Sequence, residues 1–410
     1  MRKFLTYILA LALCAPAFAQ RENFENLLVD AVSEYDEGNF EKAGMLLTRL
    51  HAADSTNDAV CYYLGMCEYR QGREQSGFEY LTKASELDPS NLWYKHMIAS
   101  QLVELGAYAK AAPMLGELVR DYPRAYNNPY MLTTAGDAHL SIYKDSLALE
   151  YYDRALKLDP GYAPAELGRA EVLKMQNNMA GYFVSLDRII SNTDVMPGAK
   201  DQILQQIMDN LEPHTWWVWS TQIKDLIAKN LQLHPDDIEA NYLQMNVAFI
   251  ESDTTEVYDI CRRVIPLAVA QGNKEKQLEA WSIMGDLYHS QGYSKSAYQA
   301  YENALAVDPS YAPVLNNYAY FLCLEGKKLR KAEKMSAITV RDNPDNATYL
   351  DTYAWILHLL KKDAEAKPYL KHAMIFGGRD SKEVLQHYAE ILRALGDELA
   401  DYYQSLADQK

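Results

Sequence analysis

Glycines spaced 34 residues apart are the feature of this chain that most restricts its fold. They stand at Gly38, Gly72 and Gly106, and further copies follow at Gly292 and Gly326. Prolines recur at similar or roughly doubled intervals, at Pro89, Pro123, Pro160, Pro235, Pro309 and Pro344. A fixed period of this length is typical of structural repeats that stack on one another. Each glycine closes one amphipathic run and each proline a second, so the period predicts a stack of helix pairs.

The clearest copy of the repeat runs from Leu278 to Tyr311. Its first run carries four residues that share one helix face, at Trp281, Met284, Gly285 and Tyr288. After a break at Gln291-Gly292, the second run carries Ala297, Tyr301 and Ala304 and ends at Asp308-Pro309. The small residues allow two antiparallel helices to approach closely, and the aromatic residues fill the sides.

The spacing W-x2-M-G-x2-Y, then A-x3-Y, then proline resembles the tetratricopeptide repeat, with Met284 in the usual leucine position. The resemblance covers most of the chain. It implies an all-α fold, a right-handed α-solenoid of stacked antiparallel helix pairs with about ten or eleven repeats. It also implies that the first helix of each pair lines a concave face.

A chain of 410 residues is longer than the roughly 250–300 residues at which a single core stops growing. The pattern divides it into a signal peptide over 1–19, an N-terminal array over 20–196, divergent helical repeats over 197–277, and a C-terminal array with a capping helix over 278–410. In the divergent part helical periodicity persists while the glycine and proline pattern fades, which predicts two irregular repeats.

The first 19 residues have two basic residues, an apolar run from Phe4 to Cys14, and a small-residue end at Ala17-Phe18-Ala19. This pattern is typical of a secretory signal peptide cleaved before Gln20. A lipoprotein leader anchored at Cys14 is the alternative, and Leu13 disfavours it because such leaders carry a small residue there. No later stretch is apolar enough to span a membrane. We therefore expect an exported, periplasmic protein.

The charge of the chain limits its partners. The formal net charge is -16, so nucleic acid and anionic lipid are poor partners, and a neutral or basic protein or peptide is favoured. The four cysteines after the leader form no C-x-x-C pair, which favours buried structural thiols at Cys61, Cys67, Cys261 and Cys323.

Motifs of catalysis are missing from the sequence. No two of the nine histidines lie four apart, so there is no helical zinc pair, and G-x-S-x-G, phosphate-loop and dinucleotide patterns are absent. We expect no cofactor, no metal and no enzymatic activity.

The resemblance assigns groove-facing positions to polar and aromatic residues beside the packing stripe. The residues expected to bind a partner are Tyr62, Met66, Tyr69, Trp93, His96, Tyr130, Asp137, Asn316, Tyr320 and Trp355. The first helices of the repeats offer further groove positions at Lys174, Asp286, His289, Asp351, His358, Gln386 and Arg393. The function implied is a non-enzymatic envelope scaffold or adaptor that binds peptide segments. The alternatives are that several of these residues only cover neighbouring helices, or that exposed aromatics such as Trp93 or Trp216 bind carbohydrate or cell wall. An enzyme of an unrecognised kind is a third.

The sequence departs from the repeat pattern at two places, and each departure allows two interpretations. Glu34 and Glu68 occupy the place of the usual packing aromatic, and tyrosines follow one residue later at Tyr35 and Tyr69. These tyrosines either project into the groove or are buried by a rotation of the helix. The cluster Trp216, Trp217 and Trp219 either forms an exposed aromatic platform or fills a packing gap, and three residues so close in sequence cannot share one helix face.

Overall fold

The computed structural model describes residues 23–410, so the expected leader, its cleavage site and Cys14 lie outside the described residues. The chain divides into two compact units, which meet in sequence between Val195 and Met196. The expected boundary at 277 lies inside the second unit, so the divergent repeats and the C-terminal array are parts of one compact body.

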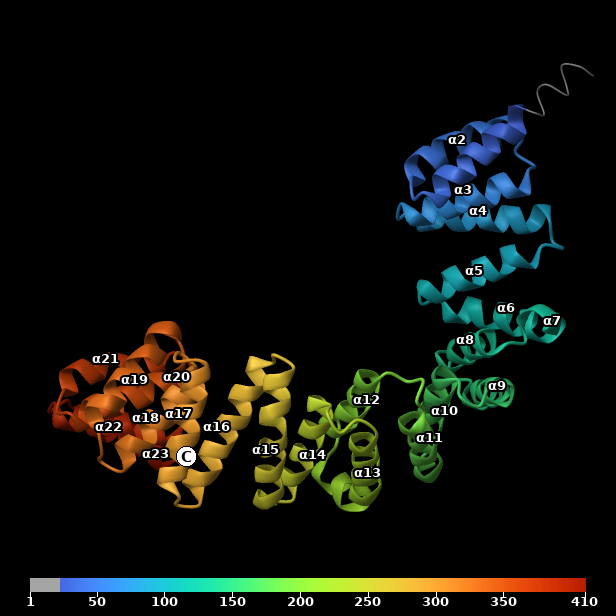
Figure 1. Ribbon diagram of the computed structural model, residues 1–410. Coiled ribbons are helices and arrows are strands. Elements are labelled where there is room, and N and C mark those ends of the chain that lie inside the picture. The colour runs from blue at the N-terminus through green and yellow to red at the C-terminus, as the bar shows by residue number, and fades with distance from the viewer. Residues whose placement is uncertain (1–22) are drawn as a thin grey trace, which may run out of the picture. The chain divides into compact units, whose positions relative to one another are not determined.

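The N-terminal unit is a series of helices joined by short turns (Figure 1). After a helix over residues 23–36 it contains α2 (Phe40–Ala53), α3 (Asp58–Arg70), α4 (Glu74–Leu87), α5 (Leu92–Glu104), α6 (Tyr108–Asp121), α7 (Pro123–Tyr126), α8 (Pro129–Leu140), α9 (Asp145–Leu158), α10 (Ala163–Met175) and α11 (Met179–Ser191).

The C-terminal unit has the same organisation. It contains α12 (Pro197–Asp209), α13 (Pro213–Leu233), α14 (Ile238–Ile250), α15 (Thr254–Ala270), α16 (Lys274–Ser290), α17 (Ser294–Val307), α18 (Ala312–Leu324), α19 (Leu329–Asp342), α20 (Ala347–Leu359), α21 (Asp363–Ala373), η1 (Gly378–Asp380), α22 (Lys382–Ala394) and α23 (Ala400–Asp408).

These helices pair as the sequence predicts. Over residues 23–410 they form eleven consecutive pairs, which confirms the all-α fold and the expected repeat number. The two irregular repeats are α12 with α13 and α14 with α15, and α13 is the longest helix among the described residues, at 21 residues. The short helix α7 lies between the third and the fourth pair and has no counterpart in the repeat pattern.

A glycine, a tyrosine and an aspartate hold the best copies of the pair together. A Cβ added to Gly285 on α16 would lie 2.2 Å from the Tyr301 ring on α17, so the glycine makes room for that ring. The Tyr301 hydroxyl then donates to Asp286 at 2.5 Å. In the N-terminal unit, Gly136, Tyr152 and Asp137 repeat the arrangement, with 2.6 Å for the added Cβ and 2.7 Å for the hydrogen bond. The repeat pattern is therefore a packing device.

The periodic glycines have a backbone reason. Each of those that close a first helix has a positive φ, from +62° at Gly326 to +84° at Gly38, a region that side chains disfavour. Four pairs place another residue there, at Tyr143, Asn177, Ser252 and Lys361, with φ between +57° and +64°. The pattern fades at these turns because the geometry is kept without glycine.

All four cysteines after the leader are buried and free, as predicted. Burial raises the pKa of the Cys67 thiol to about 11 and those of Cys261 and Cys323 to about 12. These thiols are therefore protonated at neutral pH and act as small apolar side chains.

Candidate functional site

The first helices of successive pairs contact one another, so each unit presents a surface made mainly by them. In the C-terminal unit α16 contacts α18, α18 contacts α20, and α20 contacts α22. In the N-terminal unit α8 contacts α10, and tyrosine rings bridge the earlier first helices, Tyr35 to Tyr63 at 5.6 Å and Tyr62 to Tyr94 at 5.3 Å. We call these surfaces the N-terminal and the C-terminal first-helix face.

Trp93 is the most prominent residue of the N-terminal first-helix face. It lies on the first turn of α5, where the Asn91 side chain caps the helix by accepting from the Trp93 backbone N–H at 3.2 Å. Its indole is 51% exposed, and its Nε1–H donates to the Tyr62 hydroxyl on α3 at 3.0 Å. The hydrogen bond fixes the indole edge and leaves a large ring surface open to solvent.

His96 continues this surface one turn along α5. Its ring makes edge contacts with Trp93 at 5.1 Å and with Tyr126 of α7 at 5.6 Å. Burial lowers the pKa of His96, so the imidazole is neutral at pH 7. Its Nδ1 is buried and has no hydrogen-bond partner among the described residues. Tyr126 was not predicted as a site residue, because it lies on α7, outside the repeat pattern from which the groove positions were assigned.

The other predicted residues of this unit have different environments. Tyr130, at the start of α8, is exposed, while Met66 on α3 is buried. Asp137 accepts the Tyr152 hydrogen bond of the packing device, and the Lys174 ammonium lies over the Tyr182 ring at 5.6 Å. Tyr62, Trp93 and His96 lie close together, and Tyr130 adds an exposed ring on α8, the first helix of the next pair.

The shifted tyrosines are used for packing. The Tyr69 ring lies against Gly77 of α4, where an added Cβ would come within 2.6 Å of it, and burial raises the pKa of its hydroxyl to about 12. Tyr35 packs edge-on against Phe40 and Tyr63. Of the two alternatives, the structure shows the second, in which the tyrosines are packed.

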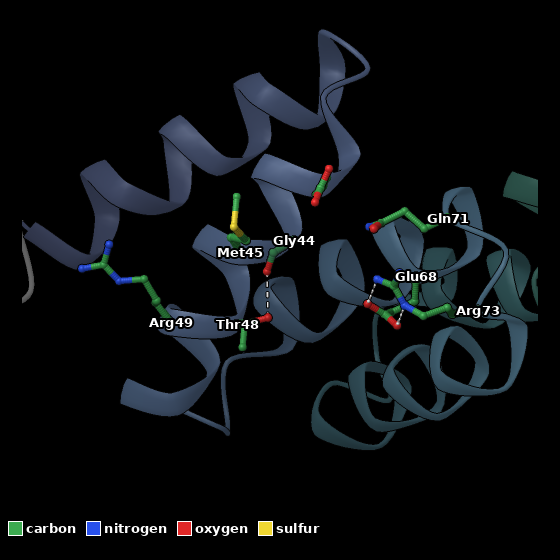
Figure 2. Close-up of a pocket in the computed structure, with 8 residues that line it drawn as sticks. Gly44, Met45, Thr48, Arg49, Glu68, Gln71 and Arg73 are labelled. Carbon is green, nitrogen blue, oxygen red and sulfur yellow. Dashed lines mark hydrogen bonds and ion pairs between the residues drawn. The ribbon is translucent and has the colours of Figure 1, made fainter.

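The glutamates in the aromatic positions bind basic side chains of the following helix. The Arg73 guanidinium donates two hydrogen bonds of 2.6 Å to Glu68, which lowers the pKa of that carboxyl (Figure 2). Glu34 accepts from Lys42 and, at 3.0 Å, from Asn39. The Glu68 pair borders a cavity of about 550 Å³ beside α2, whose wall includes Met45, Thr48 and Arg49 (Figure 2).

The aromatic side chains of the C-terminal first-helix face are paired with one another. Trp355 on α20 stacks on His358 at 4.9 Å and on His387 of α22 at 4.0 Å. His387 Nδ1 lies 2.9 and 3.0 Å from the two oxygens of Asp351, a buried carboxyl whose pKa burial raises. This stack joins two first helices through one tryptophan.

Most of the remaining predicted residues of this face also have partners. The Tyr320 hydroxyl on α18 donates to Glu383 on α22, His289 stacks on Phe321 at 3.5 Å, and Asp286 accepts from Tyr301 and Asn317. Asn316 is buried, and its Oδ1 has no partner among the described residues. Arg393 pairs at 3.5 Å with Asp401.

Within the tryptophan cluster, one residue is packed and another is exposed. Trp216 is 7% exposed and packs inside the C-terminal unit, whereas Trp217 is 83% exposed. Both line a cavity of about 710 Å³ with residues of α12 and of the turn that follows α14. The suggestion that Trp216 is an exposed sugar platform is therefore wrong, and Trp217 is the open indole.

Metal sites and membrane-spanning helices are two further features that the described residues can be searched for. Within residues 23–410, no three His, Cys, Asp or Glu side chains are arranged to hold a metal ion. None of the helices in this range combines the length and apolarity that crossing a membrane requires.

Comparisons with known proteins agree with the helix pairs. A family model described as tetratricopeptide repeat matches residues 239–405. A tetratricopeptide repeat and J domain-containing co-chaperone, DNJ1 of Cryptococcus neoformans, is 32% identical over 82 residues, 20% of this chain and 15% of that protein. The type IV pilus assembly protein PilF of Pseudomonas aeruginosa is 24% identical over 159 residues, 38% of this chain and 60% of that protein. The chain thus spans less than two thirds of either relative.

Solved structures show the same kind of similarity. MamA of Desulfovibrio magneticus, from residue 41 to its end, is 15% identical, with 42% of this chain and 93% of that chain covered and a TM-score of 0.38. The complex of Naa15 and Naa10 bound to HypK has a chain that is 12% identical, with 93% and 62% covered and a TM-score of 0.40.

The family match therefore shows tetratricopeptide repeats over residues 239–405, and the helix pairs before them have the same organisation. Stacked helix pairs of this kind present extended surfaces, as the two first-helix faces do.

Proposed function

We propose that this chain is an exported scaffold that binds a peptide segment or a helix of another protein on its N-terminal first-helix face. The observation that carries the proposal is the open Trp93 indole, which Tyr62 holds in place beside His96 and Tyr126. A large ring with a fixed orientation offers contact area at low entropic cost, which is why tryptophan and tyrosine dominate binding energy at interfaces.

His96 adds a polar group to this surface. A buried Nδ1 without a partner is costly, and a turn of the His96 ring toward a partner's hydrogen-bonding group next to Trp93 would remove that cost. The net charge of -16 favours a neutral or a basic partner. An imidazole that is uncharged at pH 7 does not repel either kind. The proposed mechanism is therefore a few aromatic anchors plus one hydrogen bond, without enzymatic chemistry.

The envelope location belongs to the same proposal and rests on the leader pattern over residues 1–19. Expression in a bacterial host followed by fractionation should place the chain outside the cytoplasm, with a mature N-terminus at Gln20. A lipid-modified Cys14 would instead support the lipoprotein alternative, and a cytoplasmic chain that starts at Met1 would refute export.

Site-specific crosslinking tests the binding surface. A photo-reactive phenylalanine analogue at Trp93 or Tyr130 should capture a protein in the native envelope, and Tyr62→Ala should reduce the capture at Tyr130. Tyr293→Ala and Tyr402→Ala are matched controls, because these rings are 60% and 57% exposed and lie on the other unit. Equal capture by analogues placed at Tyr293 and Tyr402 would refute a specific surface.

Purified components then separate protein binding from carbohydrate binding. The captured partner should bind the wild-type chain at least about tenfold more tightly than the triple variant of Tyr62, Trp93 and Tyr130 to alanine. Thermal unfolding of that variant should stay close to wild type. Competition by cell-wall sugar fragments would favour the carbohydrate alternative, and a collapse in stability would show that these residues only cover neighbouring helices.

A further inference from the structure

The corner where α12, α13 and α14 meet has an apolar surface that is separate from the N-terminal first-helix face. The cavity of about 710 Å³ lies here, and its apolar wall includes Met208, Leu211, Trp216, Trp217 and Ile250. Its size is within the range of sites that enclose one or two side chains or a small ligand. All of these residues belong to the C-terminal unit.

The apolar surface continues outside the cavity. Trp217 and Val218 are largely exposed at the start of α13, and Phe249 and Ile250 are exposed at the end of α14. Single exposed apolar residues are ordinary, but a group of them around an apolar cavity marks a surface that another molecule covers. The extra length of α13, which starts with Pro213, brings the two tryptophans to this corner.

Acidic residues outnumber basic residues around this corner. The segments 208–225 and 249–253, which form it, contain five acidic residues, one lysine and no arginine. Glu251 lines the cavity, and Lys224 binds it at 2.7 Å. Glu212 lies between the lining residues Leu211 and Pro213, and its side chain is 73% exposed. Lys200 on α12 is fully buried beside His234 and adds no positive charge to the surface.

We infer that this corner is a second docking site, which takes a basic segment of a protein partner with one large apolar side chain as its anchor. The apolar side chain enters the cavity and lies against Trp216 and Trp217. Flanking lysines or arginines lie near Glu212 and the surrounding acidic residues, where a cation also gains from the faces of exposed indoles. An anionic membrane would meet the same acidic rim and be repelled, so the charge favours the protein segment.

Synthetic peptides test this pairing without knowledge of the natural partner. The probe is a fluorescein-labelled peptide K-K-L-F-K-K, with K-K-S-S-K-K and E-E-L-F-E-E as controls, and the readout is fluorescence anisotropy with the full chain. K-K-L-F-K-K should bind at least about tenfold more tightly than either control, since it alone has both the anchor and the charge. Its affinity should fall as salt rises, because exposed charges are screened.

Variants assign the binding to this corner. Trp217→Ala should weaken K-K-L-F-K-K at least about tenfold without unfolding the chain, because the indole is exposed. Glu212→Gln should weaken it severalfold and reduce its salt dependence. Trp93→Ala should leave this affinity within about twofold, so failure here and failure of the N-terminal first-helix face can be told apart.

Several results would overturn the inference. Equal binding of K-K-S-S-K-K would mean that charge alone acts, and equal binding of E-E-L-F-E-E would mean that the acidic rim has no effect. Binding to phosphatidylglycerol vesicles, or to a chitin-type oligosaccharide, that requires Trp217 and exceeds the binding of K-K-L-F-K-K would assign the corner to a membrane or a sugar instead.

Discussion

The two first-helix faces come from one repeat pattern and differ in what they leave open. On the N-terminal face, Trp93 has one hydrogen bond at its edge and one edge contact with His96, and about half of the residue is exposed. On the C-terminal face, Trp355 stacks with two histidines, and one of these histidines is fixed by a buried carboxyl. A groove position in the pattern therefore does not define a binding residue. The neighbouring side chains decide whether the ring serves packing or is free to meet a partner.

The comparison assumes that both faces are supported by the same glycine–tyrosine packing. Gly285→Val should destabilise the chain by about 3 kcal/mol, because the added atoms overlap the Tyr301 ring, and Gly136→Val should act similarly through Tyr152. Urea unfolding with hydrogen exchange of α16 and α17 measures this locally, since solenoids need not unfold in one step.

Gly292→Ala is the matched control for this prediction. It adds a methyl group where nothing lies within 4 Å, so its cost is limited to the positive φ and should be about 1 kcal/mol. A Gly285→Val chain as stable as Gly292→Ala would mean that Tyr301 can move aside, and the shared packing would lose its importance.

Exchanging the two tryptophans for alanine tests the comparison directly. Trp355→Ala should cost about 2 to 3 kcal/mol, because both stacked histidines lose their stacking partner. Trp93→Ala should cost less than about 1 kcal/mol and act on partner binding instead. Thermal unfolding of the two variants side by side gives the answer, and equal losses would remove the distinction between a packing face and an open face.

Asp201 on α12 is a buried carboxyl of the C-terminal unit whose charged form is disfavoured. Burial, and secondly the charge of Asp237, raise the pKa of Asp201 to about 6, although Asn230 donates to it at 2.6 Å. Between about pH 4 and pH 6 the folded chain therefore binds this proton more tightly than the unfolded chain does, so stability falls as pH rises through that window and is level above it.

Asp201→Asn should remove this slope and raise the free energy of unfolding at pH 7 by about 2 kcal/mol, since the amide still accepts from Asn230. Urea unfolding at pH 4.5 and pH 7 measures the difference. Asp225→Asn on the exposed face of α13 is the control and should change neither value. A variant that is less stable at pH 7 would show that the carboxylate has a favourable partner.

The fold could be predicted from sequence because it depends on local chemistry. Turn glycines, small residues at the helix contacts and prolines after second helices recur at fixed places, and the helix bounds follow them to within a few residues. Even the divergent repeats were found, since their helical periodicity remains where Ser252 replaces the turn glycine.

The candidate site was less predictable for a physical reason. Trp355 is stacked partly because of His387, which lies 32 positions further along the chain and comes close only when repeats stack. Tyr126 joined the N-terminal first-helix face through an insertion that has no counterpart in the repeat pattern. Exposure within the tryptophan cluster likewise depends on how α12 and α14 cover one side of α13.

The smallest predicted effect concerns turns that lack glycine in each unit. Tyr143 after α8 and Lys361 after α20 have φ of +58° and +64°, where a side chain costs about 1 to 2 kcal/mol and glycine costs less. Tyr143→Gly and Lys361→Gly should each stabilise the chain by up to about 1 kcal/mol in thermal unfolding, because the greater freedom of unfolded glycine offsets part of the gain. Equal gains would show that both turns belong to the shared scaffold. Tyr143 is highly exposed, so a Tyr143→Gly chain that gains stability but captures less partner at Trp93 would extend the open surface of the N-terminal unit into this turn. The strained backbone at Tyr143 would then have been retained because the side chain binds the partner. Lys361→Gly should not change partner capture.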